Sequence, residues 1–175
     1  MPGNIRLNSE GMEKHIAFIS VGSNMGDKLE NCKNGIATLT ESRISTLKKQ
    51  SKFYLTEPVD YKDQDWFVNS IVKIETILDP FQLFNKLQSI QQDTGRIHDT
   101  VKYGPRVLDL DIILFDDIVI DSTKLIIPHP RMHKRCFVLK PFCDIDPKIV
   151  HPVLKKDMQY LLDNLDDNGQ RTRDL

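Results

Sequence analysis

Two amphipathic helix patterns, each placed between strand patterns, constrain the fold of this chain more than any other feature. In the first, Asp27 precedes a stripe of apolar residues at helical spacing, and Glu30 follows three residues later, as in a capping box. The second begins at Asp79-Pro80, where proline takes the first helical position, and Gly95 is suited to end it. A helix that leaves one strand and returns to another packs across a sheet. We therefore expect one sheet covered by helices.

The strand patterns lie before, between and after these helices. Apolar or alternating runs predict strands over 15–21, 53–56, 67–77 and 107–115, with a short partner strand over 118–120. Further helical patterns follow over 131–139 and 158–165. The order, βαββαββ with a helical C-terminal third, predicts an α+β fold: a ferredoxin-like βαββαβ sandwich, with a mostly antiparallel sheet and helices on its faces.

The balance of charges argues against a general nucleic-acid binder. Lys and Arg number 24 against 25 Asp and Glu, a net charge of −1, whereas such binders carry a basic excess. No apolar run approaches the ~20 residues that span a bilayer. The N-terminus lacks the apolar stretch of a signal peptide. The three cysteines form no CxxC pair, which is typical of proteins in a reducing compartment. We expect a cytoplasmic protein with no membrane partner, one domain over 15–165, a flexible extension over 1–14 and a polar tail over 166–175.

Asp109 and Asp111 form the sharpest chemical signal in the sequence. Side chains alternate along a strand, so both carboxylates are expected on one face, about 6.6–7 Å apart. The core-facing side would then hold their apolar neighbours: Leu108, Leu110, Ile112 and Leu114. Mg²⁺ binds a few carboxylate oxygens together with substrate phosphates, so the pair is suited to a metal–nucleotide complex. The alternative is a solvated strand face whose charges pair with nearby Lys or Arg.

Cations gather in the sequence on both sides of this acidic pair. They are Arg96, Lys102 and Arg106 upstream, and Lys124, His129, Arg131, Lys134 and Arg135 downstream. Cations beside a metal-loaded acidic pair suit a polyphosphate, because they stabilise its developing charge; the alternative is that they only solubilise loops. The chain has no GxxxxGK[ST], no GxGxxG after the first strand and no kinase-type HRD or DFG, so any nucleotide site lacks a P-loop and a Rossmann turn.

Phe67, Asn69 and Phe137 are candidates for binding a flat heterocycle. Such a ring takes two aromatic faces and an amide for its edge, and Phe67 and Asn69 share one face of a predicted strand. The alternative for Phe67 is ordinary burial in the core, which is usual for a phenylalanine on a strand.

These residues belong to segments that resemble one enzyme family over about residues 15–165. The segments are SVGSNMGD (20–27), FYLTEPV (53–59), DWFVNSIV (65–72), YGPRVLDLDIILF (103–115) and IPHPRMHKRCFVLKP (127–141). They resemble 6-hydroxymethyl-7,8-dihydropterin pyrophosphokinase (2-amino-4-hydroxy-6-hydroxymethyldihydropteridine diphosphokinase) of folate biosynthesis. The resemblance implies transfer of the β,γ-diphosphate of ATP to the pterin hydroxymethyl group, which leaves AMP.

The resemblance also implies roles for individual residues. Asp109 and Asp111 would bind two Mg²⁺ ions that bridge the ATP triphosphate, and Arg96 and Arg106 would stabilise the transferred group. The pterin would stack between Phe67 and Phe137, with Asn69, Thr56 and Val59 around it. Contacts to ATP would come from Gln88, Lys102, Tyr103, Ile112, Lys124, His129 and Arg135. Gln91 and His98 stand where the family often has Glu and Arg, so we assign them no catalytic role.

Two alternatives to this enzyme remain at this level. One is a non-catalytic ferredoxin-like module that binds a pterin or a nucleotide, because this fold hosts many functions. The other is a family member that binds pterin without transferring diphosphate. The family also occurs within longer folate-pathway chains, so the resemblance implies either a monomer or one domain of a fused chain, with only small-molecule substrates.

Overall fold

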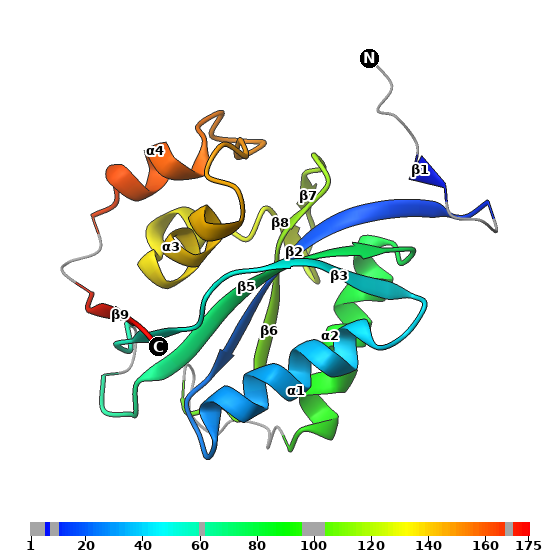
Figure 1. Cartoon of the computed structure of the whole chain (residues 1–175). Helices are drawn as coiled ribbons and strands as arrows, with labels where there is room; N and C mark the ends of the chain where they lie inside the picture. Colours follow the sequence, from blue (N-terminus) through cyan, green and yellow to red (C-terminus); the bar gives the residue numbers. More distant parts are fainter. Residues whose placement is uncertain (1–5, 8–10, 60–61, 96–103, 167–169) are drawn as a thin grey trace.

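The computed structural model describes residues 6–7, 11–59, 62–95, 104–166 and 170–175 (Figure 1). The helices are α1 (Lys28–Thr40), α2 (Pro80–Asp93), α3 (Cys136–Ile145), α4 (Met158–Asp163) and the 3-10 turn η1 (Met132–Lys134). The strands are β1 (Arg6–Leu7), β2 (Glu13–Ser23), β3 (Ser45–Gln50), β4 (Tyr54–Thr56), β5 (Phe67–Thr76), β6 (Asp109–Phe115), β7 (Ile120–Asp121), β8 (Ile126–Ile127) and β9 (Thr172–Asp174). In this described part, no helix has the length and apolar composition that crossing a membrane requires.

The main sheet has the topology that the element order predicted. β2 lies between β5 and β6 and pairs antiparallel with both. On the other side of β5, β3 and β4 pair antiparallel with successive parts of that strand. The strand order β6-β2-β5-β3, with α1 and α2 as the two crossovers, is that of a ferredoxin-like sandwich. The predicted α+β class is thus confirmed.

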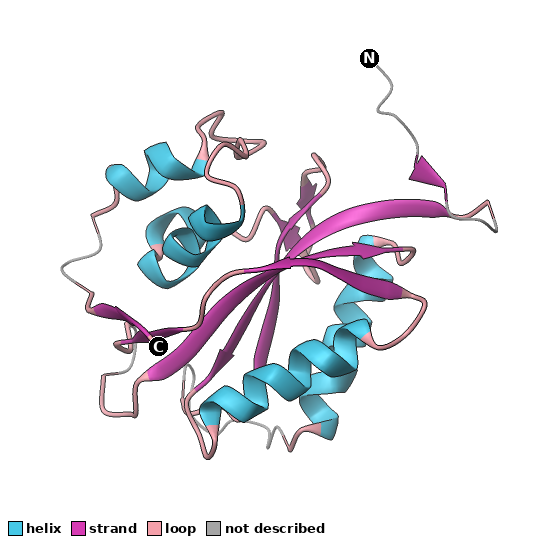
Figure 2. Ribbon diagram, in the orientation of Figure 1, coloured by secondary structure: helices cyan, strands magenta, loops and turns pink. Residues whose placement is uncertain are grey.

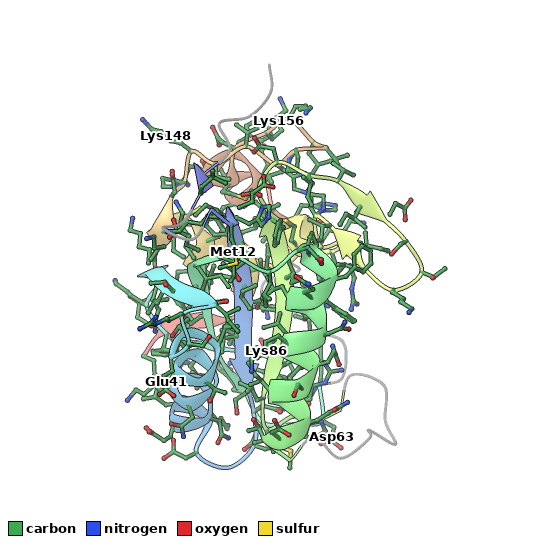
Figure 3. The ribbon with its side chains drawn as sticks, turned by 90° about the vertical axis from the view of Figure 1, so that its right-hand side faces the viewer. Met12, Glu41, Asp63, Lys86, Lys148 and Lys156 are labelled. Atoms are coloured by element: carbon green, nitrogen blue, oxygen red, sulfur yellow. The ribbon has the colours of Figure 1, made fainter. Side chains whose placement is uncertain are left out.

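Helices lie on both faces of the sheet (Figure 2). Each face has its own apolar core. On one face, α1 and α2 lie side by side (Figure 3). They bury Leu39 and Leu87 against residues such as Val72. On the other face, α3 packs over β2 and β5, and its Phe142 stacks on Phe18 of β2 at 4.5 Å between ring centroids, whereas α4 packs against α3. This second face is the one that carries the candidate site.

The helix boundaries follow the predicted capping residues. The Asp27 side chain accepts a hydrogen bond from the Glu30 amide at the start of α1. Asp79 and Gln82 form a reciprocal capping box at the start of α2. At its end Gly95 has a φ of +92°, a left-handed conformation that glycine adopts without strain.

The edge strands differ from the sequence-based expectation. β3 was not predicted, because five of its six residues are exposed and its pattern does not alternate. β9 lies within the polar tail predicted over 166–175, where it pairs with β4 through the backbone and therefore needs no apolar side chains. β2 begins at Glu13, inside the segment expected to be an extension, because β1 pairs with it there.

Three local predictions were wrong. β7 begins at Ile120 and pairs with β8 instead of with the strand before it. The helix predicted over 131–139 is instead a 3-10 turn followed by α3, which ends at Ile145. The helix continues through Pro141 because burial of its apolar face outweighs the one backbone hydrogen bond that proline cannot make. The β2–β6 pairing shifts register between Phe18 and Ile19, so Leu114 joins the α3 side and not the side of Leu110.

Gly35 places α1 in close contact with the start of β6. A methyl group at this position would lie 2.8 and 2.9 Å from the two terminal carbons of Leu108, which is itself buried. Gly→Ala inside a helix ordinarily stabilises by about 1 kcal/mol. Here we expect Gly35→Ala to lower the free energy of unfolding by about 1–2 kcal/mol, because the overpacked side chain has no room to move. Urea unfolding measures this, and an unchanged or raised stability would contradict the packing described.

Candidate active site

A cavity of about 250 Å³ lies at the end of the sheet where β2 ends and β6 begins. Its floor is the sheet face toward α3 and includes Gly22, Asn69, Asp109 and Asp111. One wall is the segment 129–138, which leads into α3, and the other is the segment that follows β4. Asp63, in the β4–β5 connection, lies at this end of the molecule (Figure 3). Five separate stretches of the chain therefore meet around one small cavity.

Asp109 and Asp111 project from the same face of β6 into this cavity, as the strand alternation predicted. They lie opposite Gly22 and Ser20 of β2 in the strand register. Arg106 Nη1 is 2.7 Å from Asp109 Oδ1, and both side chains are about a quarter exposed. The acidic pair thus already has a guanidinium beside it, which offsets part of the repulsion between its members.

Asn24 fixes the segment that carries Arg106. Its Oδ1 accepts a hydrogen bond from the Arg106 amide at 2.7 Å, and its own amide donates to the Arg106 carbonyl at 3.0 Å. Its Nδ2 donates to Gln64 Oε1 at 2.9 Å and to the Asp65 carbonyl at 3.2 Å. This buried asparagine therefore joins two segments that border the cavity.

Gln91 of α2 supports the acidic pair from the opposite side of β6. It is 1% exposed, and its Oε1 accepts a hydrogen bond from the amide of Leu110, the residue between the two aspartates. Its Nε2 donates to the Leu87 carbonyl at 3.1 Å. The side chain thus ties edge strand β6 to α2, which agrees with a structural role.

The other end of the cavity is lined by an amide and aromatic rings. Asn69 is buried, and its Nδ2 donates to Thr56 Oγ1 at 2.6 Å. A methyl group on Gly22 would lie 2.7 Å from Asn69 Oδ1, so only glycine leaves room for this amide. Phe67 and Phe137 line the same cavity, and the Arg135 guanidinium lies 5.2 Å from the centre of the Phe137 ring.

His129 adds a neutral hydrogen-bond donor to this site. Burial, together with the nearby Arg135 and Arg131 guanidiniums, lowers its pKa from 6.5 to about 4. Its Nδ1 accepts a hydrogen bond from the Arg131 amide at 3.2 Å, so Nε2 carries the proton. The imidazole is therefore an uncharged donor near pH 7.

We expect the lowered pKa of His129 to make the protein less stable in mild acid. Between pH 6.5 and 4 the unfolded state binds more protons at this residue, so the free energy of unfolding rises with pH. Above pH 6.5 the neutral His129 costs no stability. As pH falls from 6.5 through 4, the free energy of unfolding decreases by on the order of 2–3 kcal/mol. Urea unfolding at several pH values, with His129→Gln for comparison, measures it. An identical pH dependence in both proteins would contradict this assignment.

The structure brings together most of the site residues predicted from sequence. Those lining the cavity are Thr56, Val59, Phe67, Asn69, Arg106, Asp109, Asp111, His129, Arg135 and Phe137. Three others do not line it: Ile112 packs into the core against α1 and α2, Gln88 lies on α2, and Lys124 is exposed between β7 and β8. Arg96, Lys102 and Tyr103 lie outside the described residues.

Sequence reasoning missed several residues around the cavity. Ile113, and not Ile112, lines it, and Glu57, Gln64 and Val138 line it as well. Arg131, one of the candidate cations named from the sequence, also lines it. Asn24, which bonds to the Arg106 amide, was assigned no role from the sequence. Its position directly after a strand that ends opposite the acidic pair is the signal that would have identified it.

The carboxylates of Asp109 and Asp111 could bind a hard cation only together with a substrate that supplies further oxygen atoms. Among the described residues, no group of three or more His, Cys, Asp or Glu side chains could hold a metal ion. Mg²⁺, however, is commonly bound by one or two carboxylates plus substrate phosphates and water. Two carboxylates on one cavity face, with cationic side chains nearby, fit that binding mode.

Fold and site together define a ferredoxin-like α+β protein whose cavity has an acidic, cation-flanked end and an aromatic, amide-bearing end. The sequence model of the family 7,8-dihydro-6-hydroxymethylpterin-pyrophosphokinase matches residues 18–147. The chain belongs to this family.

Individual relatives agree with this assignment. The 2-amino-4-hydroxy-6-hydroxymethyldihydropteridine pyrophosphokinase of Bacillus subtilis is 44% identical over 131 residues, which cover 75% of this chain and 78% of the relative. The folic acid synthesis protein fol1 of Schizosaccharomyces pombe is 41% identical over 162 residues, or 93% of this chain. The chain spans only 22% of the length of that protein.

A solved structure supports the fold independently. The Plasmodium falciparum HPPK-DHPS wild-type structure with pterin and p-hydroxybenzoate superimposes with a TM-score of 0.69, covering 90% of this chain and 42% of that one. The two sequences are 16% identical, so this likeness concerns the fold.

Proposed function

We propose that this chain transfers the β,γ-diphosphate of ATP to the hydroxymethyl group of 6-hydroxymethyl-7,8-dihydropterin, releasing AMP. One observation carries the proposal: a single small cavity joins Asp109, Asp111 and Arg106 to Phe67 and Asn69. The first group suits a polyphosphate and the second suits a flat, hydrogen-bonding heterocycle. Membership of the pyrophosphokinase family supports the same reaction.

The aromatic end of the cavity would bind the pterin. Its ring would stack against Phe67 and Phe137, as flat heterocycles do on aromatic side chains. The buried amide of Asn69, held by its hydrogen bond to Thr56, would recognise the polar edge of the ring. Val59 lines this end and would add an apolar contact.

The charged end of the cavity would bind the triphosphate. Arg106 and Arg135 would contact phosphate oxygens, and the protonated Nε2 of His129 would donate a hydrogen bond without adding charge. Asp109 and Asp111 would hold Mg²⁺, with two ions expected from the resemblance. When bound, Mg²⁺ supplies Lewis-acid polarisation of the phosphate oxygens.

Transfer would occur in a single displacement. The pterin hydroxyl oxygen would attack the β-phosphorus and release its proton to solvent, while the bond between that phosphorus and the oxygen shared with the α-phosphate breaks and AMP leaves with the bonding electron pair. Arg106 stabilises the charge that develops on the transferred group. No separate general base is assigned, so positioning and electrostatics would supply the rate.

Separation of the nucleotide products tests this proposal. ATP, Mg²⁺ and 6-hydroxymethyl-7,8-dihydropterin are incubated with the protein, and AMP and ADP are separated by chromatography. We expect AMP that depends on both the pterin and Mg²⁺. Formation of ADP would indicate an ordinary kinase, and saturable pterin binding without any turnover would indicate a non-catalytic binding module.

A further inference from the structure

The C-terminal segment 170–173 holds the backbone of the cavity wall that follows β4. This wall begins at Glu57, which lines the cavity together with Pro58 and Val59. The Glu57 amide donates a hydrogen bond to the Arg171 carbonyl at 3.0 Å. The Gln170 Nε2 donates to the Glu57 carbonyl at 2.7 Å. Both backbone polar groups of Glu57 are therefore bonded to the C-terminal segment.

The side chains of Glu57 and Arg171 form a two-point ion pair at the same place. Arg171 Nη2 is 3.0 Å from Glu57 Oε1, and Arg171 Nε is 3.3 Å from Oε2. This pairing lowers the pKa of the Glu57 carboxyl and raises the pKa of Arg171. Planar two-point contacts fix orientation as well as distance.

The same segment also contacts the other end of the β4–β5 connection. The guanidiniums of Arg171 and Arg173 lie 5.1 and 5.5 Å from the centre of the Trp66 ring, within the range of cation–π contact. Trp66 directly precedes Phe67, a predicted pterin contact. Lys28 Nζ also donates a hydrogen bond to the Trp66 carbonyl at 2.9 Å.

We propose that residues 170–173 position the pterin end of the cavity, with Arg171 as the principal positioning residue. They hold both ends of the β4–β5 connection, Glu57 at one and Trp66 at the other, before the pterin binds. An ordered wall lowers the entropic cost of binding, so its loss weakens affinity. The segment lies beyond residues 18–147, which match the family. The inference rests on the proposed function for the identity of the ligand.

Replacement of Arg171 tests the inference through pterin binding. We expect Arg171→Gln to raise the Kd and KM for 6-hydroxymethyl-7,8-dihydropterin about threefold to tenfold, with KM for ATP and kcat at saturating pterin unchanged. Arg171→Lys keeps the charge but loses the paired geometry, so we expect an intermediate Kd. A Kd for Arg171→Lys equal to that of the wild type would show that charge alone matters and would overturn the inference.

A matched control removes a different ion pair, one made by Asp174 of β9, the strand that directly follows Arg171. Lys52 Nζ lies 3.3 Å from Asp174 Oδ2, and the Lys52 side chain is not among those that line the cavity. We expect Lys52→Gln to leave the pterin Kd unchanged. An equal weakening by both variants would indicate a general loss of stability and would overturn the inference.

Tryptophan fluorescence provides a readout that does not depend on turnover. Trp66 is the only tryptophan in the sequence, so its emission reports directly on the contact with Arg171. We expect Arg171→Gln to shift this emission and Lys52→Gln to leave it unchanged. An unshifted emission together with an unchanged pterin Kd would overturn the inference. A wild-type protein that binds pterin but forms no AMP would overturn the proposed reaction, and the binding titrations would still decide the role of Arg171.

Discussion

Asp111→Asn is expected to lower the rate of pterin-dependent AMP formation by about a thousandfold or more, because the proposed metal–triphosphate complex would lose a charged ligand. Asp109→Asn is expected to have a similar effect. Asp111→Asn is the sharper of the two tests, since it leaves the ion pair between Arg106 and Asp109 intact. Steady-state rates over a range of Mg²⁺ concentrations measure the effect, and the required Mg²⁺ concentration should rise.

The control for this prediction is an aspartate outside the cavity. Asp121 is exposed on β7 and does not line the cavity, so Asp121→Asn should retain full activity. Pterin binding and thermal unfolding of Asp111→Asn would establish that the variant is folded. A folded Asp111→Asn protein with a rate within tenfold of the wild type would refute the assigned role of this carboxylate.

Arg106→Ala is expected to reduce kcat by about a hundredfold while changing the Kd for pterin by less than about threefold. Its guanidinium pairs with Asp109 of β6, whereas Phe67 and Asn69, the proposed pterin contacts, belong to β5. Its charge therefore matters most when negative charge develops on the transferred group. Single-turnover kinetics and pterin titration separate the two quantities.

Arg43→Ala is the matched control, because Arg43 is an exposed arginine in the connection between α1 and β3. We expect it to behave as the wild type. Equal losses of kcat and pterin affinity in Arg106→Ala would count against selective stabilisation of the transition state. They would indicate instead that the loss of Arg106 disturbs the whole cavity through its contacts with Asn24.

The fold was predictable from sequence where local chemistry determines structure. Asp27, Asp79 and Gly95 mark helix ends through their own hydrogen bonding or backbone conformation, so these boundaries were confirmed. β3 and β9 were missed because both are edge strands stabilised by backbone pairing, which leaves no apolar pattern in the sequence. The register shift at Phe18–Ile19 depends on two strands at once and has no local signature.

The candidate site, too, was predictable only where local sequence determines the geometry. Strand alternation alone predicts that Asp109 and Asp111 share a face, and the structure confirms it. The meeting of Asn69 with Gly22, or of Asn24 with Arg106, depends on strand register and loop contacts between distant segments. The role suggested for Ile112 came from the resemblance, whereas in the structure its side chain faces the α1 and α2 core. The contacts of Arg171 were not predicted, because the sequence around it, 166–175, was interpreted as a polar tail.

Transfer of a label from the β-phosphorus of ATP tests the central claim most directly. ATP carrying ³²P only at that position is incubated with Mg²⁺, the protein and 6-hydroxymethyl-7,8-dihydropterin, and the products are separated. Diphosphate transfer moves the label into the pterin product and leaves unlabelled AMP. Label that remains in ADP while the pterin gains a single phosphate would contradict the account.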